Sequence, residues 1–234
     1  MLMEENQQSI YNTKIMAKKK IDNRKLIIDA YTHYVLRNGN TPGSVFLFAE
    51  ENNLTETDFY NHFGSFEAIE KTIFKLFFDN TLDLLKKNKE YKAFDAKNKL
   101  LSFYYTFFEV LKANRSFVRY SLENNKNRLG ALTLLSDLRS NFQKYVDDLD
   151  INTLDLQSDK LTKIKDKGVK EIVWSQLLLT IKFWLDDHSA DFEKTDLFIE
   201  KSINAGFDIL DITPLKSVVD FGKFLFKEKI NPIA

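Results

Sequence analysis

Apolar residues recur along the chain at the three- and four-residue spacing of amphipathic helices, and no segment shows the strict alternation of a half-buried strand. Only 7 Gly and 3 Pro interrupt the sequence, so few positions break a helix. The pattern predicts an all-α protein with about ten helices. The predicted helices include one stopped at 38–40, one from 44 to about 52, one from 55 to 63, a long one after 65, one around 100–111, one from 129 to about 149, one from 169 to about 187, one from 195 to 210 and one that begins at 213.

Helix-start signals support several of these boundaries. Thr55 is followed three residues later by Asp58, a pair that resembles a capping box. Ser65 is placed to cap the long helix that follows, and Thr213-Pro214 offers a cap and a first-turn proline. The polar stretch 150–168 has no apolar period, so it is predicted to be a loop, or a short helix with loops.

Composition excludes several classes of protein. The 234 residues include 34 basic and 34 acidic side chains, so bulk charge makes no case for a nucleic-acid partner. There is no Cys, which excludes disulfides, thiolate nucleophiles and Cys-bound metals. The first residues lack the apolar core of a signal peptide, and no uncharged run approaches the ~18 residues that a membrane span needs. We therefore expect a cytoplasmic protein.

One segment carries a specific motif. Its residues are Ser44-Val45, Ala49, Leu54, Thr55, Phe59-Tyr60, His62-Phe63, Ser65, Glu67 and Ile69. In this order and spacing the segment resembles the DNA-binding signature of the TetR family of bacterial transcriptional regulators. The predicted order of short helices, a long connecting helix and a large helical remainder also resembles that family.

The resemblance implies a fold and an organisation into domains. It implies a three-helix, helix-turn-helix head joined by a long helix to a larger body that binds a ligand and dimerises. We expect a flexible extension at 1–17, the DNA-binding domain at 18–64 and the body at 65–234. The second helix of the motif corresponds to the recognition helix, with Tyr60 and His62 near phosphates. The candidate DNA-binding residues are Lys18, Lys19, Lys20, Ser44, Thr55, Thr57, Tyr60, Asn61 and His62.

The charges of this segment depart from the family pattern. No Lys or Arg occurs from Asn38 through Glu70. The acidic residues there are Glu50, Glu51, Glu56, Asp58, Glu67 and Glu70. The family usually has a basic residue at the position of Glu56, and at that of Phe66 a lysine that can meet a phosphate. Carboxylates repel phosphates, although acids in a first helical turn also favour the helix dipole.

The larger half suggests a ligand cavity and a dimer. Its helices are rich in aromatic and aliphatic residues, and the helix near 169–187 is apolar nearly all round, which indicates burial on two sides. The alternative for this helix is an ordinary central core helix, and for the aromatic residues simple packing. The candidate ligand-binding residues are Phe103, Tyr104, Phe107, Phe108, Phe117, Trp174 and Leu178. The resemblance implies a two-fold dimer, with Ile181, Trp184, Leu185, Phe198, Ile199 and Ser202 as candidate interface residues.

Other functions are less well supported. His33, His62 and His188 are isolated, and there is no glycine-rich phosphate loop, so we expect no enzyme, no metal and no cofactor. Residues 183–207 are similar to the helical lipid-binding protein of ubiquinone biosynthesis, which shares the TetR-type fold. The main hypothesis is a homodimeric regulator that binds DNA and a small apolar effector. The alternative is a protein of this fold that has lost operator binding and binds a lipid or a partner. Membrane contact by the last helix is not expected.

Overall fold

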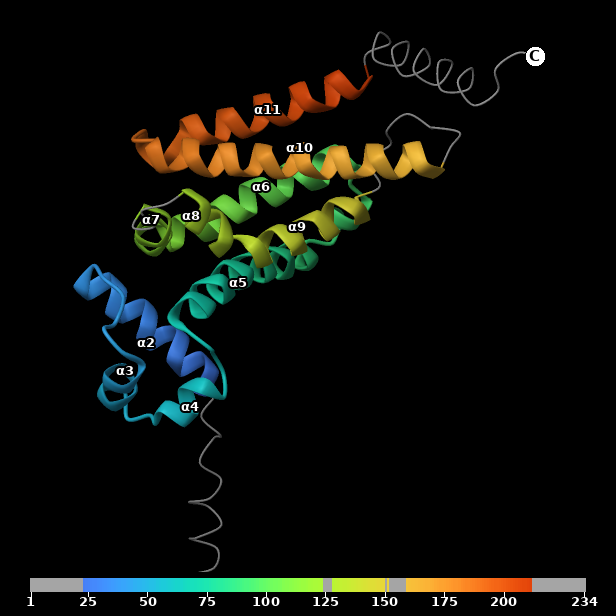
Figure 1. Ribbon diagram of the computed structural model, residues 1–234. Coiled ribbons are helices and arrows are strands. Elements are labelled where there is room, and N and C mark those ends of the chain that lie inside the picture. Colours follow the sequence, from blue (N-terminus) through green and yellow to red (C-terminus); the bar gives the residue numbers. More distant parts are fainter. Residues whose placement is uncertain (1–22, 124–127, 150, 152–158, 212–234) are drawn as a thin grey trace, which may run out of the picture. The chain divides into compact units, whose positions relative to one another are not determined.

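The computed structural model describes residues 23–123, 128–149, 151 and 159–211. Within these ranges every regular element is a helix, which confirms the predicted all-α fold (Figure 1). The α-helices are α2 (Asn23–Asn38), α3 (Val45–Glu51), α4 (Glu56–Tyr60), α5 (Phe66–Lys87), α6 (Ala96–Ala113), α7 (Arg115–Glu123), α8 (Arg128–Leu134), α9 (Ser136–Asp148), α10 (Asp159–Asp186) and α11 (Glu193–Asp211). Two 3-10 helices are η1 (Glu90–Ala93) and η2 (Ala190–Phe192). The last predicted helix, from 213, lies outside the described residues.

The chain divides into two compact units. The head comprises, among the described residues, 23–73 and 116–123, and therefore contains α2, α3, α4, the start of α5 and most of α7. The body comprises the remaining described residues, including α6, α8, α9, α10 and α11.

The predicted helix stop and the predicted capping box in the head are confirmed. Helix α2 stops at Asn38, and Gly39 adopts a φ of 70°, a conformation that glycine adopts without steric cost. Asn53, in the turn before α4, has a φ of 55°, which asparagine tolerates better than most residues. Thr55 and Asp58 form the expected capping box: the Thr55 hydroxyl accepts from the Asp58 amide at 3.0 Å, and the Asp58 carboxylate accepts from the Thr55 amide at 2.9 Å.

An aromatic cluster forms the core of the head. We use "head cluster" for the rings of Tyr31 from α2, Phe48 from α3, Phe59 from α4 and Phe66 from α5. Phe66 stacks on Tyr31 with ring centroids 5.5 Å apart, and meets Phe48 and Phe59 edge-on at 5.4 and 5.3 Å. Offset and edge-to-face pairs of this kind stabilise beyond the area that they bury. One ring, that of Phe66, therefore joins α5 to α2, α3 and α4.

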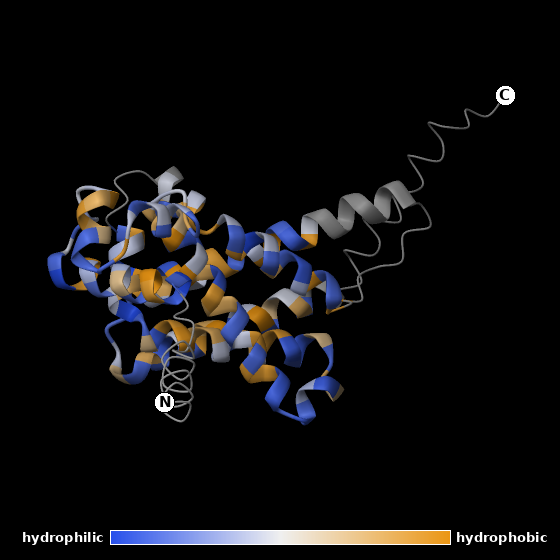
Figure 2. Cartoon of the chain, turned by 90° about the horizontal axis from the view of Figure 1, so that it is seen from below, coloured by the Kyte–Doolittle hydropathy of each residue, from blue (hydrophilic) through white to orange (hydrophobic). Residues whose placement is uncertain are grey.

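In the body, the long helices pack side by side around a second aromatic core. Helix α6 packs against α11, and α10 packs against both α9 and α11 (Figure 1). Phe103 of α6 lies at the centre of this core, with Phe142 at 5.2 Å and Tyr145 at 4.8 Å between ring centroids. Hydrophobic and hydrophilic residues are interleaved along the helices (Figure 2), as packing on one face requires.

Two predicted helix boundaries in the body are wrong. The single helix expected from 129 to about 149 is two helices, because Leu135 leaves helical geometry with φ −89° and ψ 8°. This break lets the consecutive Leu134 and Leu135 both be buried, whereas neighbours on a straight helix point 100° apart. Helix α10 begins at Asp159 rather than near 169. Its first turns are rich in lysine, a good helix former, so they form a helix without an apolar period.

Arg115 anchors the end of α10 within the body. Its guanidinium donates to the backbone carbonyls of Trp184 at 2.8 Å, Leu185 at 3.1 Å and Asp187 at 3.3 Å. It also lies over the rings of Trp184 and Phe192, 4.4 and 4.5 Å from their centroids. A cation that binds the last carbonyls of a helix satisfies otherwise unpaired acceptors and favours the helix dipole.

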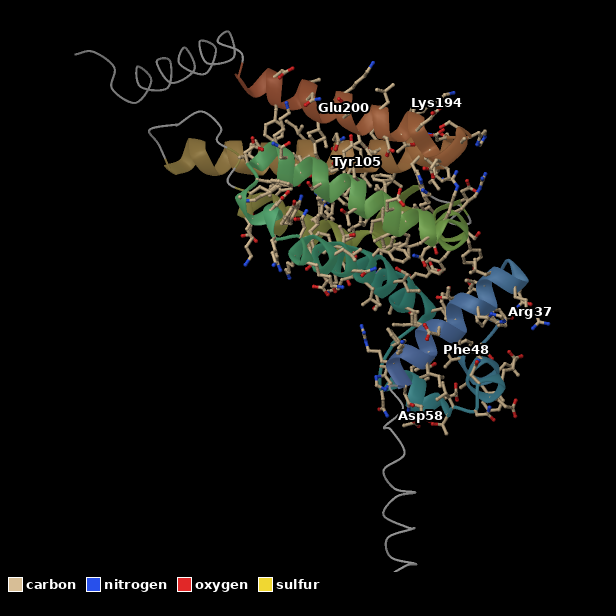
Figure 3. The ribbon with its side chains drawn as sticks, turned by 180° about the vertical axis from the view of Figure 1, so that it is seen from behind. Arg37, Phe48, Asp58, Tyr105, Lys194 and Glu200 are labelled. Carbon is tan, nitrogen blue, oxygen red and sulfur yellow. The ribbon has the colours of Figure 1, made fainter. Side chains whose placement is uncertain are left out.

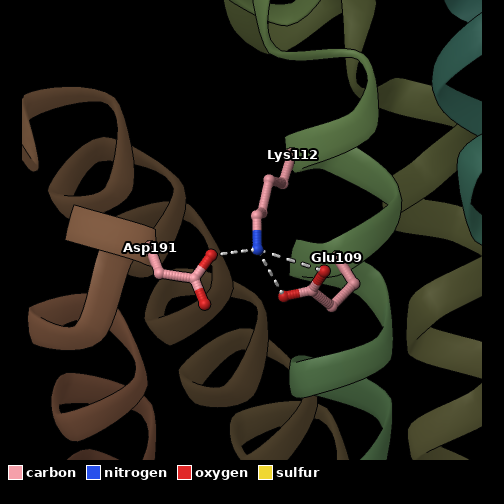
Figure 4. Close-up of polar contacts among 3 residues, drawn as sticks. All are labelled: Glu109, Lys112 and Asp191. Carbon is pink, nitrogen blue, oxygen red and sulfur yellow. Dashed lines mark hydrogen bonds and ion pairs between the residues drawn. The ribbon is translucent and has the colours of Figure 1, made fainter.

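The turn from α10 to α11 is held in an uncommon backbone conformation. Asp191 and Phe192 have φ values of 55° and 61°, which cost a non-glycine residue roughly 1–2 kcal/mol each. Phe192 is fixed by its contact with Arg115. The Asp191 carboxylate forms an ion pair with the Lys112 ammonium, with Nζ and Oδ1 2.5 Å apart. Figure 4 shows Lys112 between Asp191 and Glu109.

Asp187 fixes the start of α11. Its carboxylate accepts hydrogen bonds from the backbone amides and hydroxyls of Ser189 and Thr195. Burial opposes ionisation of Asp187, but these four donors outweigh it and lower its pKa to about 2. The acid at this helix end is therefore a cap, the role that its position in the sequence favours over metal binding or acid–base chemistry.

Replacing Arg115 with Lys should lower the free energy of unfolding by about 2–4 kcal/mol. The Lys ammonium cannot donate to three carbonyls and stack on two rings as the planar guanidinium does. Arg119→Lys on the same helix is the matched control. Its ion pair with Glu123 is exposed, so the change should cost less than about 0.5 kcal/mol. Urea unfolding followed by far-ultraviolet circular dichroism reports on both, since it measures the helices of the body, which contains Arg115, and those of the head, which contains Arg119. Equal effects of the two substitutions would contradict the anchor.

Replacing Phe66 with Lys should destabilise the head by about 3 kcal/mol, because the change removes a ring from the head cluster and brings a charge toward it. Phe46→Lys provides the control, since the Phe46 side chain on α3 is 56% exposed and should tolerate the charge. Hydrogen exchange of the α2 amides measures the stability of the head separately from that of the body. Unchanged protection in Phe66→Lys would contradict the role of the cluster.

Candidate functional site

The outer side of α4 and the turn after it form the candidate nucleic-acid interface. Thr57, Tyr60, Asn61 and His62 are exposed, and Tyr60 is 55% exposed. Phe59 and Phe63, on the other side of this segment, are buried in the head. This segment therefore presents a phenol, an amide, a hydroxyl and an imidazole to solvent, all of which can hydrogen-bond to phosphate oxygens or base edges.

The remaining candidates have other positions. The Ser44 hydroxyl caps α3 by accepting from the Leu47 amide at 3.2 Å. The Thr55 hydroxyl is engaged in the capping box of α4 but its side chain is exposed. Lys18, Lys19 and Lys20 lie outside the described residues. The structure thus brings together the candidates at 57–62 and leaves the basic run unplaced.

Three of the six acids between 38 and 70 are engaged within the head. Asp58, at the start of α4 (Figure 3), caps that helix, and hydrogen bonds from the Thr55 hydroxyl and amide lower the pKa of its carboxyl. Glu67 pairs with Lys71 at 2.9 Å. Glu70 is buried and accepts a hydrogen bond from the Tyr31 hydroxyl at 2.5 Å. These carboxylates serve the fold of the head.

The Tyr31–Glu70 contact links α2 to α5 through buried polar atoms. Burial raises the pKa of Glu70, the Tyr31 hydrogen bond opposes this shift, and the charge of Glu67 adds to it. Burial is also the largest cause of the raised pKa of Tyr31, and the hydrogen bond from Tyr31 to Glu70 raises this pKa further. Near α7, Thr41 and Tyr120 add a further hydroxyl–hydroxyl contact at 3.1 Å.

The other three acids keep the surface of the head negative. Glu50, Glu51 and Glu56 are exposed and form no ion pair with any residue that the structure describes. Positive charge nearest in sequence comes from Arg37, which is exposed at the end of α2, and from Lys71. The position where the family resemblance places a phosphate-meeting lysine holds Phe66, whose ring is part of the head cluster.

The candidate ligand-binding residues are mostly core residues. Phe103, Tyr104, Phe107, Phe108, Phe117 and Trp174 are buried, and Leu178 is half-buried. Phe117 belongs to the head and the other six to the body. Their rings pack on one another, as between Phe103 and Phe107 at 5.5 Å. None of them is among the described residues that line the pocket in the body.

That pocket has a volume of about 270 Å³ and lies between α6, α10 and α11. Its described lining residues are Leu100, Ile151, Val169, Ile172, Val173, Gln176, Ser202, Ile203, Gly206 and Phe207. All are apolar except Gln176 and Ser202. Sequence reasoning did not find this site, because aliphatic residues on three separate helices carry no local signal of a shared cavity.

The candidate interface residues divide into two groups. Ile181, Trp184 and Ile199 are buried within the body itself, whereas Leu185, Phe198 and Ser202 are half-buried. The exposed large apolar residues of α10 are instead Ile172, Leu179 and Phe183, and α11 adds Leu197. The spacing of 172, 179 and 183 places the three on one side of the helix. We call these four residues the outer stripe.

Helix α10 thus has two apolar sides, as its sequence predicts. The inner side packs in the body, and the outer stripe is exposed. Tyr105 of α6 and Glu200 of α11 are also visible on the surface of the body (Figure 3). Counting only the described residues, no helix has the length and apolar character needed to cross a bilayer. In the same residues, no group of three His, Asp or Glu side chains is arranged to hold a metal ion.

Comparison with one solved structure supports the fold. The fatty acid degradation regulator FadR from Bacillus halodurans is similar to this chain with a TM-score of 0.51 and 16% sequence identity, over 78% of this chain and 95% of that one. A TerR/AcrR-family transcriptional regulator from Aquifex aeolicus aligns at a TM-score of 0.43 and 18% identity, over 80% of this chain and 98% of that one. No curated protein matches the chain.

A family model gives the most direct assignment. The model of the tetracyclin repressor-like C-terminal domain matches residues 99–225, which is more than half of the 234-residue chain. This segment covers most of the body, from α6 to α11, and the residues of α7 that belong to the head. The motif that carries the DNA-binding resemblance lies in the head, outside this segment. The chain therefore belongs to the TetR family of transcriptional regulators.

Proposed function

We propose that the protein is a transcriptional regulator that binds DNA as a homodimer and responds to a small apolar effector. The observation that carries this proposal is the form of the head. It buries Phe59 and Phe63 and leaves Thr57, Tyr60, Asn61 and His62 exposed at the end of a capped helix. A helix whose inner side is packed in the head can present its outer side chains to the major groove of DNA.

The contacts divide by chemistry. Tyr60 and His62 donate hydrogen bonds to phosphate oxygens and so position the head on the DNA. These phosphate contacts do not by themselves distinguish one base sequence from another. Thr57 and Asn61 are free to meet base edges, where an amide pairs with adenine. The lysines at 18–20 contribute long-range attraction to phosphates. The segment before α2 therefore adds to the positive charge that Arg24, Lys25 and Arg37 give to the described head.

The exposed acids limit how tightly the head binds. A carboxylate about 6 Å from a phosphate repels it by roughly 1–3 kcal/mol, before screening by salt. Three of the six acids are engaged in the fold, which leaves Glu50, Glu51 and Glu56 to act in this way. A carboxylate also accepts a hydrogen bond from the amino group of cytosine, so Glu56 near the start of α4 is suited to base readout.

The same acids favour a second candidate function. A head whose exposed acids repel phosphates suits a protein of this family that has lost operator binding and binds a lipid or a protein partner. The apolar pocket in the body is compatible with both functions. The salt dependence of DNA binding distinguishes them, because phosphate contacts release counterions.

The outer stripe supports the homodimer. Ile172, Leu179, Phe183 and Leu197 expose apolar surface along α10 and α11 that the body does not use for its own core. A two-fold pair of such helices buries the same stripe of both subunits. Two heads then reach successive major grooves on one side of DNA, about 34–36 Å apart.

Ile172 connects the pocket to the outer stripe, because it lines the first and belongs to the second. An effector in the pocket contacts α10 on the side of the dimer interface. A ligand changes DNA affinity only when it binds two conformations of the protein unequally. Two conformations that differ in how the two copies of α10 pack against each other would bind the effector unequally, because the pocket is partly formed by α10.

Replacing Tyr60 with Ala should weaken DNA binding about tenfold per subunit, the effect of losing one hydrogen bond to a charged group. Tyr105→Ala, which removes a surface tyrosine from the body, should leave affinity unchanged. The measurement is fluorescence anisotropy with DNA recovered by repeated selection from a random pool. Replacing Lys18, Lys19 and Lys20 together with Glu should abolish retention. If affinity is the same in all these variants, the proposed interface is wrong.

Replacing Leu179 with Glu should convert the dimer into a monomer, because the change buries a carboxylate at the two-fold contact. Leu179 is 56% exposed in the single subunit, so the fold itself should be unaffected. Leu132→Glu is the control on α8, at a leucine that is 47% exposed and outside the outer stripe. Sedimentation equilibrium measures both. A Leu179→Glu protein that remains dimeric would exclude this interface.

A further inference from the structure

We propose that residues 15–20 of the chain dock on the outer face of α3, so that the acids of the head hold the basic segment before α2 when no DNA is bound. The contact goes beyond the proposed function, because it gives the exposed acids a partner within the protein and does not itself require DNA binding. Four exposed side chains on α3 carry it.

The outer face of α3 consists of Phe46, Leu47, Glu50 and Glu51. The two apolar side chains are 56% and 53% exposed, and both glutamates are exposed, whereas Phe48 between them is buried. Residues four apart lie on the same side of a helix. Each exposed apolar side chain is therefore followed, one turn further along, by a carboxylate.

The fold of the head does not account for this face. Glu50 and Glu51 lie in the last turn of α3, where the helix dipole disfavours negative charge. Neither forms an ion pair with any residue that the structure describes. The first helix of a helix-turn-helix crosses the DNA backbone, but apolar and acidic side chains are unsuited to phosphates. Adjacent exposed apolar side chains bordered by charge are instead typical of a protein contact.

Residues 15–20 have the complementary pattern. Ile15 and Met16 are followed four residues later by Lys19 and Lys20, which is the spacing of the outer face of α3 with the opposite charge. If this segment docks as a helix in the direction of α3, apolar side chains meet apolar ones and ammonium groups meet carboxylates. Such complementarity fixes both the partner and the register of a contact.

The segment leaves the head close to this face. Arg24, at the start of α2, lies over the ring of Phe63 just after α4, 5.5 Å from its centroid, and α4 packs against α3. With 16–20 helical, Met16 reaches about 16 Å from Asn23, whereas the axes of packed helices are about 8–10 Å apart. A short tether gives an effective concentration on the order of mM, so a weak contact is sufficient.

Disulfide formation in the full chain tests the contact, because the chain has no Cys of its own. Met16→Cys with Leu47→Cys leaves Ile15, Phe46 and all four charges in place. Met16→Cys with Asn61→Cys is the matched control. Asn61 is exposed at the end of α4, beside the point where the segment leaves the head, so an undocked segment would reach it at least as readily as Leu47.

We expect the Met16–Leu47 pair to form its disulfide about tenfold faster than the control pair, because docking raises the local concentration of one thiol at the other. Each rate is first divided by the reactivity of the same single cysteine toward glutathione disulfide, which removes differences in thiol pKa. Peptide mass spectrometry identifies the disulfide, and a non-reducing gel separates disulfides within a chain from those between chains.

Exchanging the charges tests the register. In the Met16–Leu47 pair, Lys19→Glu with Lys20→Glu should slow the disulfide about fivefold, and adding Glu50→Lys with Glu51→Lys should restore it, because opposite charges face each other again. About 1 M salt, where the Debye length is about 3 Å, should also slow it.

Three results would overturn the contact: equal corrected rates for the two cysteine pairs, a charge exchange that does not restore the disulfide, or a disulfide found only between chains. Selected DNA separates the contact from the proposed function, since DNA that binds the lysines should slow the Met16–Leu47 disulfide. If this disulfide forms selectively but DNA leaves its rate unchanged, the contact on α3 is correctly assigned and the role of the lysines in DNA binding is wrong.

Discussion

The head depends on the packing of three aromatic rings, those of Tyr31, Phe48 and Phe59, around the ring of Phe66. Helices α3 and α4 have only 7 and 5 residues, far fewer than the ~12–15 that an isolated helix needs for stability in water. Their positions are therefore set by tertiary contacts, with Phe48 from α3 and Phe59 from α4 both against Phe66. Because Phe59 is held inward, Tyr60 on the next position points outward, so the candidate interface is a consequence of the core.

The same ring explains why the surface of the head is poor in positive charge. The family resemblance implies a lysine at position 66, and this chain uses the position for packing. Glu70 is also used for the fold, because its buried hydrogen bond with Tyr31 holds α2 to α5. The head thus keeps the shape of a helix-turn-helix motif while much of its charge supports the fold. In the function that we propose, the lysines before α2 and the second head of a dimer supply the affinity for DNA.

Local patterns predicted the head well and the body less completely. The stop at 38–40 and the caps at Thr55 and Ser65 follow from spacing and side-chain chemistry within a few residues. The break at Leu135 and the early start of α10 could not be predicted, since the first depends on tertiary burial and the second lacks an apolar period. The pocket and the outer stripe depend on which helices pack together, and α10 is apolar on both sides, so its sequence alone cannot tell the inner side from the outer.

The salt dependence of DNA binding by the full chain tests the central claim most directly. The measurement is the association constant for a selected DNA fragment and for a scrambled one, across a range of salt concentrations. The account predicts preference for the selected fragment and a slope of log K against log salt of about −3.6 or steeper, which corresponds to roughly four or more neutralised phosphates. A shallow slope with equal affinity for the two fragments would contradict DNA recognition by this head and favour a protein of the family that binds a lipid or a partner instead.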